Sequence, residues 1–149
     1  MARIEGAITI VCPVETVFDY VADQTHEPRY NPIMVRVEKL TTGEIGPGTR
    51  FRSVARSAGR TAEMVTEYTD VERPRLLASV TTMKQAHIVY TLRFDPVAAG
   101  TRMQWSGLVR LNGASRPLAP LVTWLGGRQE RRIWTGLKRH LEGAPAGEG

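Results

Sequence analysis

Two tyrosines, Tyr68 and Tyr90, have the side chains best suited to move a proton or to orient a bound molecule. Each lies where apolar and polar residues alternate, on the apolar side of the alternation. A phenol at such a position can donate or accept a proton during a reaction. It can equally fill core space and satisfy its hydroxyl with one hydrogen bond, as buried tyrosines usually do. Tyr68 and Tyr90 are therefore catalytic candidates, and no catalytic residue is identified.

Other familiar arrangements for chemistry cannot be assigned. None of the three histidines, His26, His87 and His140, lies within metal-ligand spacing of another, and Cys12 is the only cysteine. We therefore expect no metal site, no internal disulfide and no cofactor. The segment GEIGPG (43–48) lacks the spacing of a dinucleotide-binding turn and the Lys-Ser/Thr of a phosphate loop, so it predicts a turn between strands.

The middle of the chain alternates with a period close to two. This predicts strands near 33–40, 49–58, 60–71, 75–83, 85–95 and 100–111, joined by turn residues. The inward positions are Met64, Thr66, Tyr68, Leu76, Ala78, Val80, Ile88, Tyr90, Leu92, Phe94, Met103, Trp105, Val109 and Leu111. His87 and Glu63 are predicted to face outward, although a one-residue register error would turn them inward. One apolar face and one polar face indicate an antiparallel sheet covered on one side.

The beginning of the chain predicts a strand and then a short helix. Residues 2–11 alternate, and the next residues place four apolar side chains on one helical face: Val14, Val17, Phe18 and Val21. Pro13 suits the first helical position, whereas Pro28 and Pro32 prevent a long continuation. We expect the chain to turn there, to enter the sheet as its second strand, and to place the segment THEPRYNP at one rim.

A long helix is predicted from about Pro117 to Glu142. Its apolar residues form two stripes, Leu118, Leu121, Val122 and Leu125 followed by Ile133, Leu137 and Leu141. The second stripe is rotated from the first at about 100° per residue, and Gly126-Gly127 lies between them. Paired glycines weaken a helix, so we expect a kink or break there. The tail 143–149 has too few apolar residues to pack and is expected to be disordered.

The composition suits one domain, predicted at 1–142, in a chain of 149 residues that is 42% hydrophobic. No apolar run is long enough to cross a membrane, and the N-terminus does not resemble a signal peptide. With a single cysteine, these features predict a cytoplasmic protein without integral membrane association. Much of the net charge of +5 lies between Arg116 and Glu142, without aromatic residues interleaved on that face, so we expect no nucleic-acid partner. A monomer and a homodimer are both compatible with the sequence.

This order of elements, with these residues, resembles the START-like (SRPBCC) helix-grip superfamily, and within it the bacterial polyketide cyclase/dehydrase-like branch. The matching motifs are I-x-I-x-x-P-x-E-x-V-F-D-Y-V-A-D (8–23), P-x-Y-N-P (28–32), VEKLTTGEIGPGTRF (37–51), GTRMQWSG (100–107) and PLAPLV (117–122). The resemblance covers residues 2–142. It implies an α+β fold of the Bet v 1/START type, with the order β-α-α-β6-α, in which a curved seven-stranded antiparallel sheet wraps around the long C-terminal helix.

The resemblance also implies a cavity between sheet and helix for a hydrophobic or amphipathic small molecule, lipid-like or polyketide-like. Its expected wall is Met64, Thr66, Tyr68, Ala78, Val80, Ile88, Tyr90, Leu92, Met103, Trp105, Leu118, Leu121, Val122 and Leu125. Few inward polar groups favour binding without chemistry. The alternatives are an aromatase/cyclase- or dehydratase-type enzyme using Tyr68 or Tyr90, and an interaction module that presents the basic helix to a membrane surface or an acidic partner.

Overall fold

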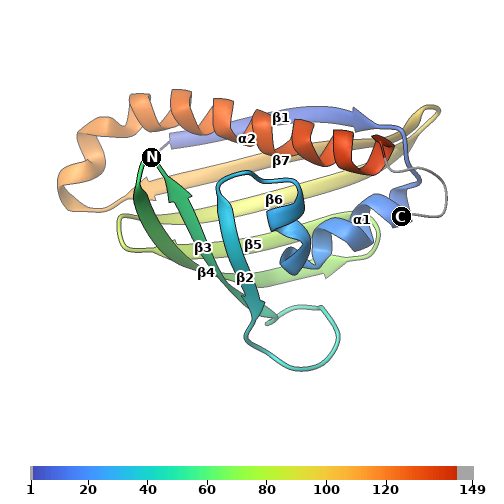
Figure 1. Cartoon of the computed structure of the whole chain (residues 1–149), viewed down its shortest axis with the longest axis horizontal. Helices are drawn as coiled ribbons and strands as arrows, with labels where there is room; N and C mark the ends of the chain where they lie inside the picture. The colour runs from blue at the N-terminus through green and yellow to red at the C-terminus, as the bar shows by residue number, and fades with distance from the viewer. Residues whose placement is uncertain (1, 144–149) are drawn as a thin grey trace.

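A curved antiparallel sheet is closed on one side by a long helix in the computed structural model (Figure 1). The model describes residues 2–143, except for the side chains at positions 114, 115 and 122. The predicted tail lies outside the described residues from position 144 onward. The elements in chain order are β1 (Ala2–Ile10), α1 (Val14–Ala22), the 3-10 helix η1 (Gln24–Arg29), β2 (Met34–Lys39), β3 (Arg50–Ser57), β4 (Arg60–Glu72), β5 (Leu76–Met83), β6 (Ala86–Val97), β7 (Gly100–Leu111), the 3-10 helix η2 (Gly113–Leu118) and α2 (Ala119–Gly143).

The sheet contains seven strands, as the resemblance implied, and their order across the sheet is β1-β7-β6-β5-β4-β3-β2. All six neighbouring pairs are antiparallel. The first two strands of the chain therefore form opposite edges, and α1 and η1 carry the chain from one edge to the other. The predicted stop of the first helix is confirmed: α1 ends at Ala22, and the Asp23 carboxylate accepts a hydrogen bond from the Thr25 N–H at 3.1 Å as η1 begins.

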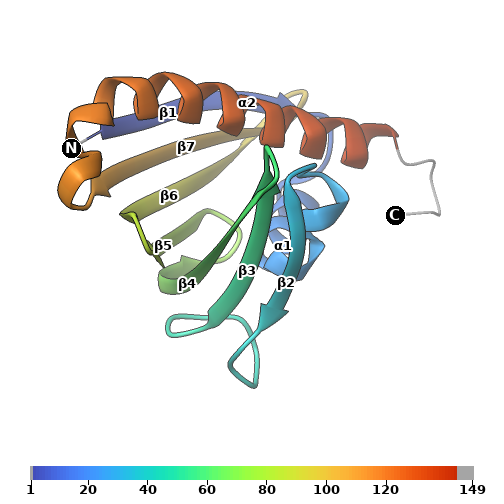
Figure 2. The same ribbon diagram turned by 60° about the vertical axis from the view of Figure 1, so that its left-hand side comes forward.

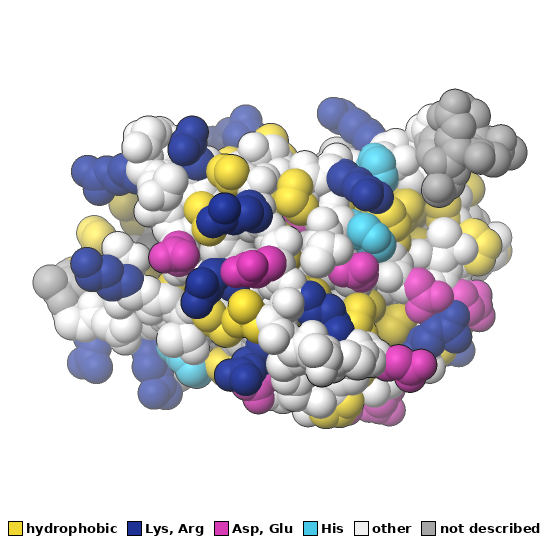
Figure 3. Space-filling model, turned by 60° about the horizontal axis from the view of Figure 1, so that its bottom comes forward, with side chains coloured by type: hydrophobic (Ala, Val, Ile, Leu, Met, Phe, Trp, Pro, Cys, Tyr) yellow, Lys and Arg dark blue, Asp and Glu magenta, His cyan; other side chains and the backbone are white. Residues whose placement is uncertain are grey.

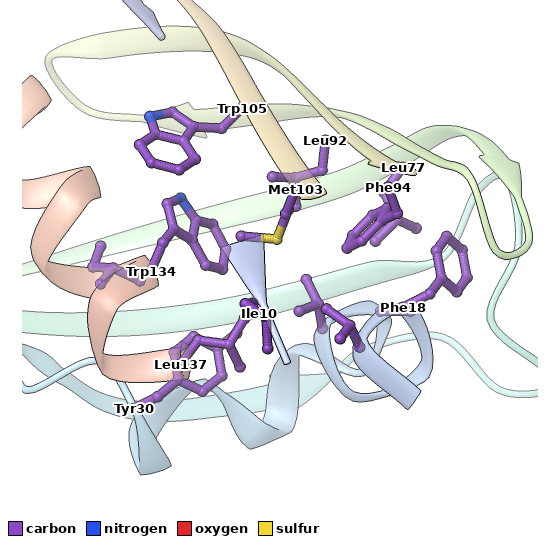
Figure 4. Packing of buried hydrophobic residues seen from close by; sticks show 14 of the residues in the cluster. Ile10, Phe18, Tyr30, Leu77, Leu92, Phe94, Met103, Trp105, Trp134 and Leu137 are labelled. Atoms are coloured by element: carbon purple, nitrogen blue, oxygen red, sulfur yellow. The ribbon is translucent and has the colours of Figure 1, made fainter. Parts of the chain in front are cut away.

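The main core lies between the concave face of the sheet, α1 and the C-terminal half of α2 (Figures 2 and 4). Ile10, Phe94, Met103 and Leu137 are fully buried there. Trp134 from α2 packs beside Trp105 from β7, with ring centroids 6.4 Å apart. The second predicted stripe on the closing helix thus faces the sheet, with Ile133 and Leu137 buried and Leu141 packed against the same cluster.

The first predicted stripe on this helix does not face the sheet. Leu118, Leu121 and Leu125 are 51%, 49% and 49% exposed, and the side chain of Val122 lies outside the described part. Small residues take the inward positions instead: Ala119 packs against strand residues, and Gly126 lies against Ile4 of β1. The prediction was wrong because the helix passes close to the strands on this face, and large apolar side chains do not fit there.

The helix is continuous through Gly126-Gly127, so the predicted break is absent. Glycine at position 126 allows close approach, because a Cβ there would collide with the end of the Ile4 side chain. A stricter case is Gly136, where a Cβ would collide with the carbonyl oxygen of Tyr30 in the segment after η1. Glycine on α2 therefore brings the helix down onto its neighbours.

The predicted inward positions on β5 are also wrong. Leu77 and Ser79 are buried on the concave face, whereas Ala78 and Val80 occupy the opposite parity. Both parities of this strand, LLASVTTM, carry apolar and small residues, so alternation does not separate its faces. The pairing of β4 with β5 also shifts register between Tyr68 and Asp70, which interrupts the alternation along the pair.

Two helical glycines of α2 form a matched test of close approach. Gly136→Ala should lower the free energy of unfolding by about 1–3 kcal/mol, because the new methyl group presses on the Tyr30 carbonyl. Gly127→Ala should raise it by up to about 1 kcal/mol, because nothing lies within 4 Å of its Cβ position and alanine favours the helix. Urea unfolding monitored by tryptophan fluorescence measures both. Equal effects at the two positions would contradict this interpretation.

Candidate functional site

A cavity of about 330 Å³ lies between the concave face of the sheet, η1 and α2. Most of its wall is apolar and comes from the strands, with Met64 from β4, Leu77 from β5, and Ile88 and Leu92 from β6. The helix α2 supplies Ile133 and Trp134, Gly126, and two polar residues, Gln129 and Glu130. Further lining residues come from the segment 24–34, which includes η1. The implied cavity is therefore present in the fold.

Six residues of the predicted wall line this cavity: Met64, Thr66, Tyr68, Ile88, Tyr90 and Leu92. All six come from β4 and β6, where the predicted alternation matches the burial pattern. His87 and Glu63 face outward on these strands, as predicted. That these residues contact a ligand stays a prediction.

The other predicted wall residues lie elsewhere. Met103 and Trp105 are buried in the adjacent core and do not line the cavity (Figure 4). Ala78 and Val80 have the wrong parity on β5, and the exposed Leu118, Leu121 and Leu125 point away from the sheet. Val122 cannot be placed, because its side chain is not described.

The hydroxyl of Tyr68 holds the end of α1 in place. It donates a hydrogen bond to the Ala22 carbonyl oxygen at 2.6 Å and accepts one from Gln24 Nε2 at 3.3 Å. Burial raises the pKa of Tyr68 well above its usual value, so the phenol stays neutral. Both hydrogen bonds serve the protein itself, which favours a structural role for this hydroxyl.

The hydroxyl of Tyr90 belongs to a small polar group on the helix side of the cavity. Trp134 Nε1 donates a hydrogen bond to the Tyr90 oxygen at 3.1 Å. The carboxyl group of Glu130, which also lines the cavity, lies near the Tyr90 hydroxyl. Burial raises the pKa of Tyr90 well above its usual value. The phenol therefore remains protonated at neutral pH.

Burial raises the pKa of Glu130 from 4.5 to about 7, because the cavity wall withholds the water that would solvate a carboxylate. The nearby Tyr90 hydroxyl acts in the opposite direction, and the negative charge of Glu27 adds to the increase. Glu130 is consequently present in both protonation states near neutral pH. Such a carboxyl group can both donate and accept a proton.

A second carboxyl group, that of Glu27 in η1, lines the same cavity. It accepts a hydrogen bond at 2.7 Å from Asn31 Nδ2, and Asn31 is only 2% exposed. Burial raises the pKa of Glu27 as well. Within residues 2–143, neither Glu27 nor Glu130 forms an ion pair, and no Lys, Arg or His lines the cavity. The cavity therefore combines apolar walls with uncompensated acidic groups.

Sequence reasoning missed these carboxyl groups, and its prediction of few inward polar groups is wrong. The polar lining also includes Gln24, Asn31, Ser53, Thr66, Ser79, Thr81 and Gln129. A usable signal existed for Glu130, which lies three residues before Ile133 and seven before Leu137 and thus on their helical face. For Glu27 the signal was weaker, because its segment was assigned to a rim and not to the cavity wall.

In the part of the chain that the structure describes, no group of three or more His, Cys, Asp or Glu residues could hold a metal ion. No helix there is long and apolar enough to span a bilayer. The single cysteine, Cys12, is half-buried, and its thiol contacts the Leu141 carbonyl oxygen at 3.6 Å. Burial raises the pKa of this thiol, so it stays protonated at neutral pH.

The curved sheet, its closing helix and the internal cavity define a START-like protein of the Bet v 1 fold type. Similar structures include a START superfamily protein from Mycobacterium smegmatis (TM-score 0.84, 15% identity, covering 97% of this chain and 100% of that one). They also include the Zhui aromatase/cyclase from Streptomyces sp. R1128 (0.80, 16%, 94% and 93%) and Ara h 8.0201 (0.77, 16%, 95% and 97%). At these identities, the similarity shows the fold alone.

The model of one family, described as "Polyketide cyclase / dehydrase and lipid transport", matches residues 1–142. The chain belongs to this family. No protein with a curated description matches its sequence.

The raised pKa of Glu130 predicts a specific dependence of stability on pH. A carboxyl group with a raised pKa in the folded state stabilises that state fully below pH 4.5, and the contribution is lost as the pH rises through about 7. The loss amounts to roughly 3 kcal/mol. Glu130→Gln should therefore be more stable than the wild type at pH 8, and the difference should shrink or reverse at pH 4.5. Urea unfolding at both pH values measures this.

A matched control is Glu67→Gln, which changes an exposed carboxylate on the outer face of β4. It should follow the pH dependence of the wild type. If Glu130→Gln follows the wild type equally closely, Glu130 is not a buried carboxyl group in the folded protein.

Proposed function

We propose that the protein binds a hydrophobic or amphipathic small molecule, lipid-like or polyketide-like, in the cavity between sheet and helix. The observation that carries this proposal is an internal space of about 330 Å³ with mainly apolar walls and a few convergent polar groups. Ligand cavities in proteins typically combine these features. An empty space of this size without a ligand would lower the stability of the protein, because unfilled core volume destabilises a fold.

The polar groups of the cavity indicate which end group the ligand carries. The titratable lining residues are Glu27, Glu130, Tyr30, Tyr68 and Tyr90, and no described lining residue is basic. A ligand carboxylate would meet these acidic groups where little water screens the repulsion. An alcohol, a phenol or a protonated amine can instead donate a hydrogen bond to Glu130 or Glu27. We therefore assign the ligand a neutral or cationic end group that donates hydrogen bonds.

Three naphthalene derivatives of similar size test this assignment: 2-naphthylmethylamine, 2-naphthalenemethanol and 2-naphthoate. Calorimetric titration at pH 8 should show saturable binding of the amine and the alcohol. The carboxylate should bind at least about tenfold more weakly, equivalent to about 1.4 kcal/mol. Glu130→Gln should reduce the difference between amine and carboxylate, because it removes the carboxylate next to Tyr90. Glu67→Gln is the control that should preserve the difference.

The outcomes separate two parts of the proposal. Absence of binding by all three probes would contradict a small-molecule cavity. Equal binding of naphthoate and amine would leave the cavity intact and contradict the assigned end group.

A second candidate function, an enzyme of the cyclase or dehydratase type, is supported by Glu130 itself. A carboxyl group with a pKa of about 7 is well suited to move a proton at neutral pH. As carboxylate it would take a proton from the carbon beside a carbonyl group, and the carboxylic acid would return this proton to a departing β-hydroxyl, releasing water and leaving a conjugated double bond. The neutral Tyr90 phenol, which lies near Glu130, would orient its carboxyl group. This assigns the acid–base role to Glu130, with the candidate Tyr90 as its partner.

The dehydration of 4-hydroxy-4-(2-naphthyl)butan-2-one to its conjugated enone, followed by absorbance, tests this activity. The rate should increase as the pH rises through about 7, since Glu130 acts as the base. Glu130→Gln should reduce the rate by a factor of about 10²–10⁴ while still binding 2-naphthalenemethanol. A rate equal to the uncatalysed background would exclude this activity on the probe and favour binding without chemistry.

A further inference from the structure

The end of η2 and the beginning of α2 expose a group of large apolar side chains that do not pack in the core. Leu118, Leu121, Trp124 and Leu125 are each about half exposed or more, and they lie within eight consecutive residues, 118–125. We call these four residues the apolar tip. Other large exposed apolar residues, such as Val35 on β2 and Val89 on β6, are spread over separate elements. A contiguous exposed apolar patch marks an interaction surface more often than scattered single residues do.

Arginines flank the apolar tip without acidic neighbours in sequence. Arg116 precedes it, Arg128 and Arg132 follow it, and all three are exposed. No Asp or Glu occurs between Asp95 and Glu130, and Glu130 faces the cavity. Among the charged side chains at the end of the molecule where α2 begins (left in Figure 3), Lys and Arg predominate.

Along the axis of α2, the leucines of the apolar tip lie before Arg128 and Arg132. A rise of about 1.5 Å per residue places Arg128 about 5 Å along the axis from Leu125 and about 10 Å from Leu121. The guanidinium group of Arg128 lies 5.2 Å from the ring centroid of Trp124. Apolar side chains of a surface-bound helix enter a bilayer by about 5–10 Å, while basic residues stay with the headgroups. With the N-terminal end of α2 directed at the bilayer, the distances along its axis place the leucines in the boundary region and Arg128 at the headgroups.

We propose that the apolar tip docks reversibly on the surface of an anionic lipid bilayer. Leucine and tryptophan side chains would enter the boundary between headgroups and acyl chains, and Arg128 and Arg132 would contact lipid phosphates. A symmetric dimer through the same face would place the arginines of one copy against those of the other, and these like charges would repel each other. A nucleic acid would neutralise the arginines but offer no apolar phase for Leu121 and Leu125.

Gly126 and Gln129, which follow the apolar tip on α2, line the cavity. Docking by the apolar tip would thus hold the cavity close to the membrane surface, where amphipathic small molecules concentrate.

Flotation with phosphatidylcholine vesicles, alone or with about one-third phosphatidylglycerol, tests this docking. The wild type should float with the anionic vesicles, float much less with the neutral ones, and lose binding at high salt. Bromine-labelled acyl chains should quench the fluorescence of Trp124, whereas Trp105 and Trp134 are buried and should respond little. The Trp124→Phe variant should still bind the anionic vesicles, and its remaining tryptophan fluorescence should be quenched much less.

Leu121→Ser and the double variant Arg128→Gln/Arg132→Gln should each reduce partitioning by about tenfold or more. Matched controls are Val89→Ser and Arg93→Gln on the outer face of β6, which should bind as the wild type does. The proposal is overturned if anionic vesicles bind no protein, if the controls reduce binding as strongly as the tip variants, or if Leu121→Ser instead abolishes a concentration-dependent dimer seen by light scattering. Salt-sensitive capture by an acidic polypeptide without flotation would also overturn it, in favour of a protein partner.

Discussion

Packing of the C-terminal half of α2 against the concave face of the sheet is the contact on which the rest of the structure depends. Leu137 is fully buried there, and Trp134 lies between Trp105 of β7 and Tyr30 after η1. Gly136 allows the Tyr30 backbone to approach the helix. One helix thus closes the sheet and fixes η1, and both sides of the cavity take their position from this contact.

The cavity exists because the inward face of α2 changes character along its length. Near its C-terminus the helix fills the sheet with large side chains such as Trp134 and Leu137. One to three turns earlier the corresponding positions are Glu130 and Gly126, which cannot fill the same volume. A leucine in place of Glu130 would suit a packed core better, since a buried carboxyl group destabilises the fold when it ionises. Its presence at the boundary between core and cavity therefore favours a functional role.

The sequence predicted the elements well because each depends on local periodicity. The strands begin and end within two residues of the predicted positions, and the alternation on β4 and β6 places Tyr68 and Tyr90 inward. On β5 both parities are apolar or small, so Ala78 and Val80 were assigned to the wrong face. Burial there depends on pairing with β4 and β6, which one strand's composition does not encode.

The same limit explains the errors on α2. Its first leucine stripe has the spacing of a buried face, yet the helix is oriented by its C-terminal half, where Ile133, Trp134 and Leu137 outweigh the leucines. Continuing that orientation backwards points Glu130 and Gly126 at the sheet and turns Leu121 and Leu125 outward. The acidic cavity wall and the exposed apolar tip are therefore two consequences of one helix orientation. A single segment of α2 consequently presents hydrogen-bonding groups to a ligand on one side and apolar, basic groups to its surroundings on the other.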